Sequence, residues 1–90
     1  NITDNETLAI EAGKFANTIF HPVSTCRMGK DSSSVVDNHL RVRGIEGLRV
    51  ADCSVMPAQI SGNTNGPAMA VGWRASDLIL SAEAKPGSRL

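Results

Sequence analysis

Two short segments of this 90-residue chain contain residue types that can do chemistry. Residues 63–67, Asn-Thr-Asn-Gly-Pro, open an apolar helical run soon after residues 48–52, a strand-like stretch that ends in the carboxylate of Asp52. At such a strand-to-helix junction, free backbone N–H groups and the positive end of a helix dipole favour anionic or carbonyl-bearing cofactors. Residues 20–29 form a second polar segment about forty positions upstream. Together the two segments indicate half of a redox active site.

Helical patterns lie toward both ends of the chain. Thr3 as N-cap and Glu6 three residues later form a capping-box pattern. Apolar residues then recur at helical spacing and predict a helix over residues 4–18. The second helix is predicted to begin near Pro67, which lies in its first turn, where the missing N–H costs little. Its predicted apolar face consists of Ala68, Val71, Ala75, Leu78 and Ile79.

Between these helices the pattern favours short strands. Residues 23–28 are expected to be extended, and apolar and polar residues alternate over 39–43, as in a half-exposed strand. A four-residue turn at 44–47 leads into a more apolar strand at 48–52. Because a lone hairpin is marginal in water, this strand needs neighbours that the chain does not contain. The expected fold class is therefore α/β: an α+β fragment whose two helices flank short strands that complete a larger sheet.

Composition excludes several classes of protein. Nine basic and nine acidic residues balance, which argues against a nucleic-acid or anionic-membrane binder. No apolar run approaches the roughly 20 residues that span a bilayer. Cys26 and Cys53 lack metal-like spacing, so we interpret them as small interior side chains and expect no metal site. The chain begins without Met, and we expect it to be a piece of a larger protein, secreted or cytoplasmic.

Five motifs occur in the order and spacing of a known family. They are His-Pro-Val-Ser-Thr-Cys-Arg-Met-Gly at 21–29, Val-Val-Asp at 35–37, Leu-Arg-Val-Arg-Gly at 40–44, Gly-Leu-Arg-Val-Ala-Asp-Cys-Ser-Val-Met-Pro at 47–57 and Ser-Gly-Asn-Thr-Asn-Gly-Pro at 61–67. They resemble the C-terminal region of the glucose–methanol–choline (GMC) flavoprotein oxidoreductases, above all the choline-dehydrogenase-like and aryl-alcohol-oxidizing members. The motif-bearing region is 20–80, within a single fragment 1–90 that ends in a tail at 83–90.

The resemblance implies an FAD-dependent enzyme that oxidises a primary or secondary alcohol to a carbonyl. His21 matches the family's active-site histidine, and an imidazole can accept the alcohol proton near neutral pH while hydride leaves for flavin N5. Phe20 and His21 are then expected to contact the substrate. Taken alone, a histidine beside a proline is more often a surface or loop residue, and the surrounding motif is what favours the catalytic role.

The helix start and the strand end carry the other roles that the resemblance implies. Asn63 matches the family position that holds a second His or an Asn, and its carboxamide can donate to the substrate oxygen as negative charge builds. Thr64 and Asn65 begin the helix whose dipole would face the flavin's pyrimidine carbonyl, and Asn63 and Thr64 are expected to bind the cofactor. Asp52 and Cys53 match the strand end that touches FAD. Helix capping by Asn63 and turn capping by Asp52 stay open as alternatives.

Two residues depart from the family pattern. Ser24 stands where Gly is usual, and Cys53 replaces the commoner Gly or Ala. Neither change removes a proposed catalytic group. Arg27, Arg41 and Arg43 are expected to be solvated or ion-paired rather than to clamp a substrate.

The expected partners are the remaining N-terminal part of the same enzyme, a small alcohol, and an electron acceptor that is either oxygen or a quinone. Two rivals stay open. One is an FAD-containing hydroxynitrile lyase of the same family, which performs no net redox reaction. The other is an isolated fragment without activity.

Overall fold

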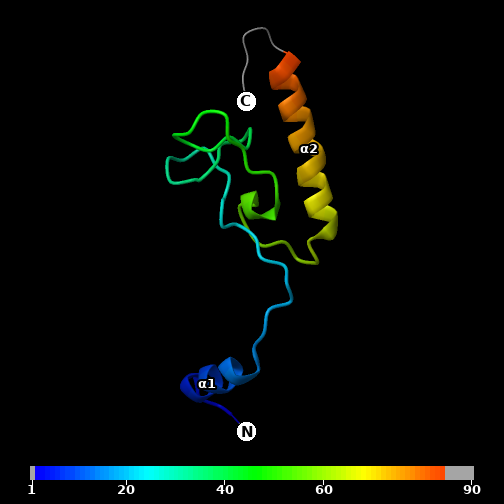
Figure 1. Cartoon of the computed structure of the whole chain (residues 1–90). Coiled ribbons are helices and arrows are strands. Elements are labelled where there is room, and N and C mark those ends of the chain that lie inside the picture. Colours follow the sequence, from blue (N-terminus) through cyan, green and yellow to red (C-terminus); the bar gives the residue numbers. More distant parts are fainter. Residues whose placement is uncertain (1, 85–90) are drawn as a thin grey trace.

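A computed structural model describes residues 2–84 of the chain. Its elements, in order, are helix α1 (Asn5–Phe15), a short 3-10 helix η1 (Cys53–Val55) and helix α2 (Asn65–Ala84). Figure 1 shows α1 alone at one end of the molecule, while α2 lies beside the looped middle of the chain. The two predicted helices are confirmed. From residue 85 onward, the predicted tail lies outside the described residues.

Helix α1 is capped by Asp4 rather than by Thr3, which corrects the predicted capping box. The Asp4 carboxylate accepts a hydrogen bond of 2.9 Å from the Thr7 N–H, and this bond lowers the pKa of Asp4. Because Asp caps a helix at least as well as Thr, the helix begins one residue later than predicted. It also ends early, at Phe15, because the next residue has extended backbone with ψ of 140°.

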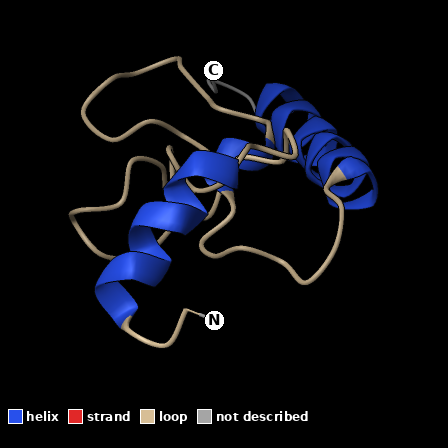
Figure 2. Ribbon diagram, turned by 90° about the horizontal axis from the view of Figure 1, so that it is seen from below, coloured by secondary structure: helices blue, strands red, loops and turns tan. Residues whose placement is uncertain are grey.

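Residues 2–84 form no β-strand, which corrects the strands predicted over 39–43 and 48–52. Isolated bridges take their place, joining Met28 to Val36, Val36 to Val42 and Arg41 to Arg49. For 39–43 the physical reason is Leu40, whose φ of 65° lies in the left-handed region and interrupts the extended backbone. For 48–52 the reason is that the described residues offer no neighbouring strand for it to pair with. For the described residues, the predicted α/β class therefore reduces to two helices and the loops that join them (Figure 2).

The predicted turn at 44–47 is present. The Val42 N–H donates to the Leu48 carbonyl at 2.9 Å, so the chain folds back on itself across this turn. Gly44 and Gly47 have φ of 82° and 78°, values that residues with a side chain rarely adopt. The turn therefore requires glycine at both positions.

A small core joins the looped middle of the chain to α2. Its buried side chains are Val36, Leu40, Val55 and Ala75, with Met28, Val42, Val50, Val71 and Leu78 packed against them. Ala75 belongs to the predicted apolar face of α2, together with Val71 and Leu78, so this face is confirmed. Because Val55 is the last residue of η1, the core fixes η1 against α2.

The rest of the molecule is open. The radius of gyration of the chain is 18.3 Å, whereas a compact domain of this length would have a radius of gyration of about 12 Å. Helix α1 buries none of its residues, and Phe15 at its end is 83% exposed. On the outer side of α2, Trp73 is 78% exposed. Large apolar side chains in such numbers are typical of a surface that contacts further polypeptide.

Candidate active site

Residues 20–28, which carry the predicted base, run alongside η1 and are held to it by main-chain hydrogen bonds. The Cys26 N–H donates to the Ser54 carbonyl at 2.8 Å. The Met28 N–H donates to the Val55 carbonyl at 2.9 Å. Since the core fixes η1 against α2, these bonds also fix the histidine segment relative to the start of α2.

Left-handed backbone flanks His21 on both sides. Phe20 has φ of 65° and Ser24 has φ of 75°. A residue with a side chain loses roughly 1–2 kcal/mol in this region, so Ser24 is strained where the family pattern has Gly. Ser24 and a turn at residues 25 and 26 also correct the extended path predicted over 23–28. Strain of this kind gathers at functional sites, where the surrounding contacts enforce it.

The imidazole of His21 reaches the start of α2. Its Nδ1 lies 2.7 Å from the Thr64 Oγ1, and Thr64 is buried, with 8% of its surface exposed. The Thr64 carbonyl accepts a hydrogen bond of 2.8 Å from the Ala68 N–H, so Thr64 occupies the N-cap position of α2. The predicted site included both His21 and Thr64, but nothing in the sequence pointed to a direct contact between them.

Asp52 caps η1, as the capping alternative for this residue required. Its Oδ1 accepts a hydrogen bond of 2.8 Å from the Ser54 N–H and a second from the Ser54 hydroxyl. These two bonds from Ser54 lower the pKa of Asp52, which favours its ionised form. Sequence reasoning missed Ser54, although an Asp two residues before a Ser is a usual signal for such a cap. Beside it, the Cys53 Sγ lies 3.9 Å from the Thr64 carbonyl oxygen.

These segments surround a hollow of about 550 Å³. It is lined by Phe20, Pro22, Thr25, Ala51, Asp52, Cys53, Ser54, Thr64 and Ala68. Four of the predicted site residues are therefore at one place: Phe20, Asp52, Cys53 and Thr64. His21 is half-buried and joins this group through its contact with Thr64, while Asn63 is exposed and lies next to Thr64 in the chain.

The start of α2, next to this hollow, suits the ring end of FAD, the cofactor that the family resemblance implies. Helix α2 has 20 residues, and the first N–H groups of such a helix have no intrahelical partner and carry the positive end of its dipole. A side chain added at Gly66 would meet nothing within 4 Å, so the backbone at the start of α2 is uncovered. A carbonyl-bearing ring fits these donors. Residues 2–84 contain no Gly-x-Gly-x-x-Gly loop for its diphosphate.

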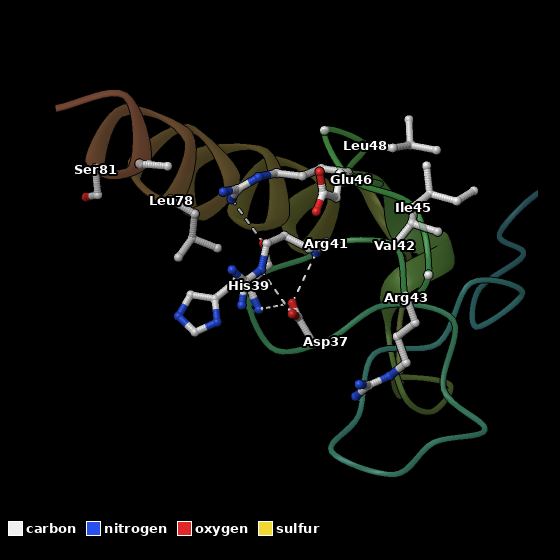
Figure 3. A pocket seen from close by; sticks show the side chains of 14 residues that line it. Asp37, His39, Arg41, Val42, Arg43, Ile45, Glu46, Leu48, Leu78 and Ser81 are labelled. Carbon is white, nitrogen blue, oxygen red and sulfur yellow. Dashed lines mark hydrogen bonds and ion pairs between the residues drawn. The ribbon is translucent and has the colours of Figure 1, made fainter. Parts of the chain in front are cut away.

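A larger hollow, of about 840 Å³, lies between residues 37–49 and the C-terminal half of α2 (Figure 3). None of the predicted site residues lines it, so size alone does not identify the reactive site. Figure 3 shows the Asp37 carboxylate facing Arg41, and the two form an ion pair of 3.0 Å. Burial alone would raise the pKa of Asp37, but the N–H groups of Arg41 and His39 and the Arg41 charge outweigh burial and lower it.

Arg27 and Arg41 form ion pairs, as predicted, whereas Arg43 makes hydrogen bonds to uncharged groups. Arg27 binds Asp31 through two hydrogen bonds, of 3.0 and 2.8 Å, which hold the pKa of that carboxyl well below its usual range. Arg43 Nε donates to the Ser34 hydroxyl at 2.9 Å. Together with the ion pair of Arg41, these contacts leave no arginine of this set aimed at the smaller hollow.

Cys26 and Cys53 are both half-buried and are not joined by a disulfide. Among the residues that the structure describes, no three His, Cys, Asp or Glu side chains are grouped closely enough to hold a metal ion. Neither described helix combines the length and the hydropathy that a bilayer span requires.

The site brings a histidine, the carboxylate that caps η1 and the uncovered start of α2 together at one place. Comparison with known protein families shows which family the chain belongs to. The family model for the C-terminal domain of GMC oxidoreductases matches residues 2–72. The chain belongs to the GMC oxidoreductase family.

Three relatives illustrate the range of the similarity. A GMC-type oxidoreductase of Mycobacterium bovis is 51% identical over 78 residues, or 87% of this chain and 15% of the relative. The oxygen-dependent choline dehydrogenase of Escherichia coli is 51% identical over 73 residues, or 81% of this chain and 13% of the relative. An alcohol dehydrogenase (acceptor) of Pseudomonas putida is 44% identical over 79 residues, which is 88% of this chain and 14% of that protein. The chain thus spans about 15% of the length of the curated relatives it matches.

Proposed function

We propose that this chain acts as the C-terminal part of a longer FAD-dependent enzyme that oxidises a primary or secondary alcohol to a carbonyl. Its relatives include proteins named alcohol dehydrogenase and choline dehydrogenase, which supports this reaction class. One structural observation carries the proposal. The histidine segment, the cap of η1 and the start of α2 meet around the smaller hollow, with His21 Nδ1 2.7 Å from Thr64 Oγ1.

Each residue has a role that its place supports. When bound, FAD supplies the hydride acceptor. His21 takes the hydroxyl proton of the alcohol as general base, and Phe20 beside it contacts the substrate. Asn63, exposed at the start of α2, donates a hydrogen bond to the oxygen on which negative charge develops.

The cofactor contacts come from the same hollow and from the residue beside it. Asp52 and Cys53 at η1, together with Asn63 and Thr64 at the start of α2, hold the ring end of the cofactor. The remaining N-terminal part of the enzyme supplies the loop for the diphosphate, and oxygen or a quinone reoxidises the reduced enzyme.

Anaerobic spectroscopy on the purified longer protein tests the proposal. We expect a visible flavin spectrum that bleaches when alcohol is added without oxygen. The variant His21→Ala should slow this bleaching by at least about 10²-fold, the low end for the loss of a positioned base. The matched control is His39→Ala, since His39 is the other histidine of the chain, is exposed and lies outside the smaller hollow.

The outcomes separate the alternatives. A protein that binds flavin but does not bleach with any alcohol, and that releases cyanide from a cyanohydrin, is a hydroxynitrile lyase. A His21→Ala variant that binds flavin and bleaches within threefold of the unaltered protein would show that another residue is the base. Absence of flavin from the longer protein would contradict the cofactor assignment.

A further inference from the structure

The residue that links the histidine to α2 is Thr64. It is one of two buried polar side chains among the described residues, and its hydroxyl lies 2.7 Å from His21 Nδ1. No other hydrogen bond to this hydroxyl occurs within residues 2–84. Leaving a buried hydroxyl without a partner costs free energy, so the contact with His21 is favoured.

Thr64 stands where a threonine would ordinarily cap the helix, yet its hydroxyl does not do so. An N-cap hydroxyl accepts from the backbone N–H of the second or third helical residue. Counting from Asn65, the third residue of α2 is Pro67, which has no N–H to donate. The second is Gly66, and its N–H makes no hydrogen bond to Thr64 in the described structure. The Thr64 hydroxyl therefore does not cap the helix and forms its hydrogen bond with the His21 imidazole instead.

The protonation chemistry of the ring decides the direction of this bond. A hydroxyl can donate or accept, whereas an imidazolium carries hydrogen on both ring nitrogens and can only donate. Once His21 has taken a proton, its Nδ1–H must donate, and the Thr64 oxygen accepts. In the neutral ring the same bond fits two tautomers, because the Thr64 hydroxyl can also donate to an unprotonated Nδ1. In that case Nε2 carries the hydrogen, and the ring has no free lone pair for the alcohol. To act as the base while this bond is kept, the neutral ring must carry its hydrogen on Nδ1, so that Nε2 has the free lone pair.

We propose that Thr64 is a positioning residue that keeps hydrogen on His21 Nδ1 and thereby makes Nε2 the atom that receives the alcohol proton. This inference rests on the proposed function, because it assigns the proton transfer of that reaction to one ring nitrogen. It goes beyond a contact of Thr64 with the cofactor. The Thr64 carbonyl accepts the first hydrogen bond of α2, and the Thr64 side chain orients the base.

The histidine segment is suited to such control. Hydrogen bonds from Cys26 and Met28 hold the segment along η1, and left-handed residues fix the backbone at Phe20 and Ser24. The backbone therefore leaves the ring few positions, and the Thr64 hydroxyl selects one of the two orientations that a ring flip would otherwise allow.

Two variants of the flavin-loaded longer protein test the inference. Thr64→Val keeps the shape and removes the acceptor, and Thr64→Ser keeps the acceptor. We expect Thr64→Val to slow anaerobic flavin reduction at saturating alcohol about 10- to 100-fold, by analogy with the loss of a partner that orients a metal-bound histidine. Thr64→Ser should restore most of the rate. Equal rates for Thr64→Val and the unaltered protein would overturn the inference.

A measurement without turnover provides the second readout. Nitrogen-15 spectra of histidine-labelled protein, with the His21 signals assigned by comparison with His21→Ala, report which ring nitrogen carries hydrogen in the neutral ring. We expect Nδ1–H in the unaltered protein and in Thr64→Ser, and a loss of this preference in Thr64→Val. Hydrogen on Nε2 in the unaltered protein would overturn the inference, whatever the rates.

The same variants separate this inference from the proposed function. If His21→Ala is as fast as the unaltered protein, the assignment of the base is wrong. If His21→Ala is slow but Thr64→Val is fast and its spectra are unchanged, only the role of Thr64 is wrong.

Discussion

Asn63 offers the sharpest separation between a catalytic and a structural role. Its side chain is exposed and makes no hydrogen bond within the described residues, and the N-cap position of α2 belongs to Thr64. Substitution at an exposed site without partners usually changes the free energy of unfolding by less than about 0.5 kcal/mol. A carboxylate near the start of a helix even gains about 0.3–1 kcal/mol from the dipole. Asn63→Asp should therefore leave the melting temperature unchanged or slightly raised.

The expected effect on activity is much larger. Asn63→Asp removes the donor and places a negative charge beside the oxygen on which negative charge develops. Loss of one such donor costs about 10²–10³-fold in rate, or about 2.7–4 kcal/mol of transition-state stabilisation. The predicted cost in activity thus exceeds the predicted change in stability several times over. Asn63→His keeps a donor and should retain substantial activity.

Anaerobic stopped-flow reduction by alcohol and thermal melting, measured on the same preparations, test this prediction. Asn38→Asp is the matched control, because it makes the same change at an exposed residue outside the smaller hollow. If Asn63→Asp binds flavin and is reduced at nearly the normal rate, the reasoning is refuted, and Asn63 is a surface residue at the start of α2.

Three further predictions concern backbone strain, pH and the cofactor. Ser24→Gly should stabilise the longer protein by up to about 1 kcal/mol, because it relieves the left-handed strain at φ of 75° at the expense of some chain entropy. Chemical denaturation measures this change in stability. An equal gain for Ser24→Ala, which keeps the Cβ, would contradict the prediction. The pKa values of Asp31, Asp37 and Asp52 are lowered by their hydrogen bonds. The stability that these carboxylates contribute is therefore fully present above the ordinary pKa of Asp, about 3.9, and is lost as the pH falls below it. Arg27→Gln should make the free energy of unfolding depend less on pH in this acid range, as denaturation at several pH values would show. An unchanged pH dependence would contradict the prediction. The chain on its own should lose added FAD on dialysis, as flavin absorbance would report, and stoichiometric retention would contradict the need for a diphosphate loop elsewhere.

The helices could be predicted from the sequence because their apolar spacing agrees with how they pack. Ala75, Val71 and Leu78 were predicted as one face of α2, and they form its contact with the core. The start of α1 was misplaced by one residue because Thr3 and Asp4 are both good caps, and spacing alone does not choose between them. The turn at 44–47 was predictable because its two glycines are the residues that left-handed backbone requires.

The strand predictions were wrong for a reason that the alternation of apolar and polar residues does not reveal. Alternation over 39–43 reports which side chains face the interior, and Leu40 is indeed buried. It reaches the core through a left-handed backbone rather than through a continuous strand. Leucine has no preference for that conformation, so only the tertiary packing around Leu40 determines it.

The residues of the candidate site were predictable as a set, but their contacts were not. The resemblance to a family predicted Phe20, Asp52, Cys53 and Thr64 as site residues, and in the structure all four line one hollow. The hydrogen bond between the histidine ring and the Thr64 hydroxyl was missed, since no periodicity or spacing relates two residues so far apart in the chain.

The separation of His21 and Thr64 in the sequence affects how the site forms during folding. His21 and Thr64 are separated by 43 positions, and closing a loop of this length costs about 3 kcal/mol of chain entropy. One hydrogen bond contributes only about 1 kcal/mol, so it cannot close the loop unaided. We therefore expect the core around Val36 and Val55 to close first and the base to meet its partner as a late step. A substitution that merely loosens Val36 should therefore delay the appearance of an active enzyme during refolding, although it touches no reacting atom.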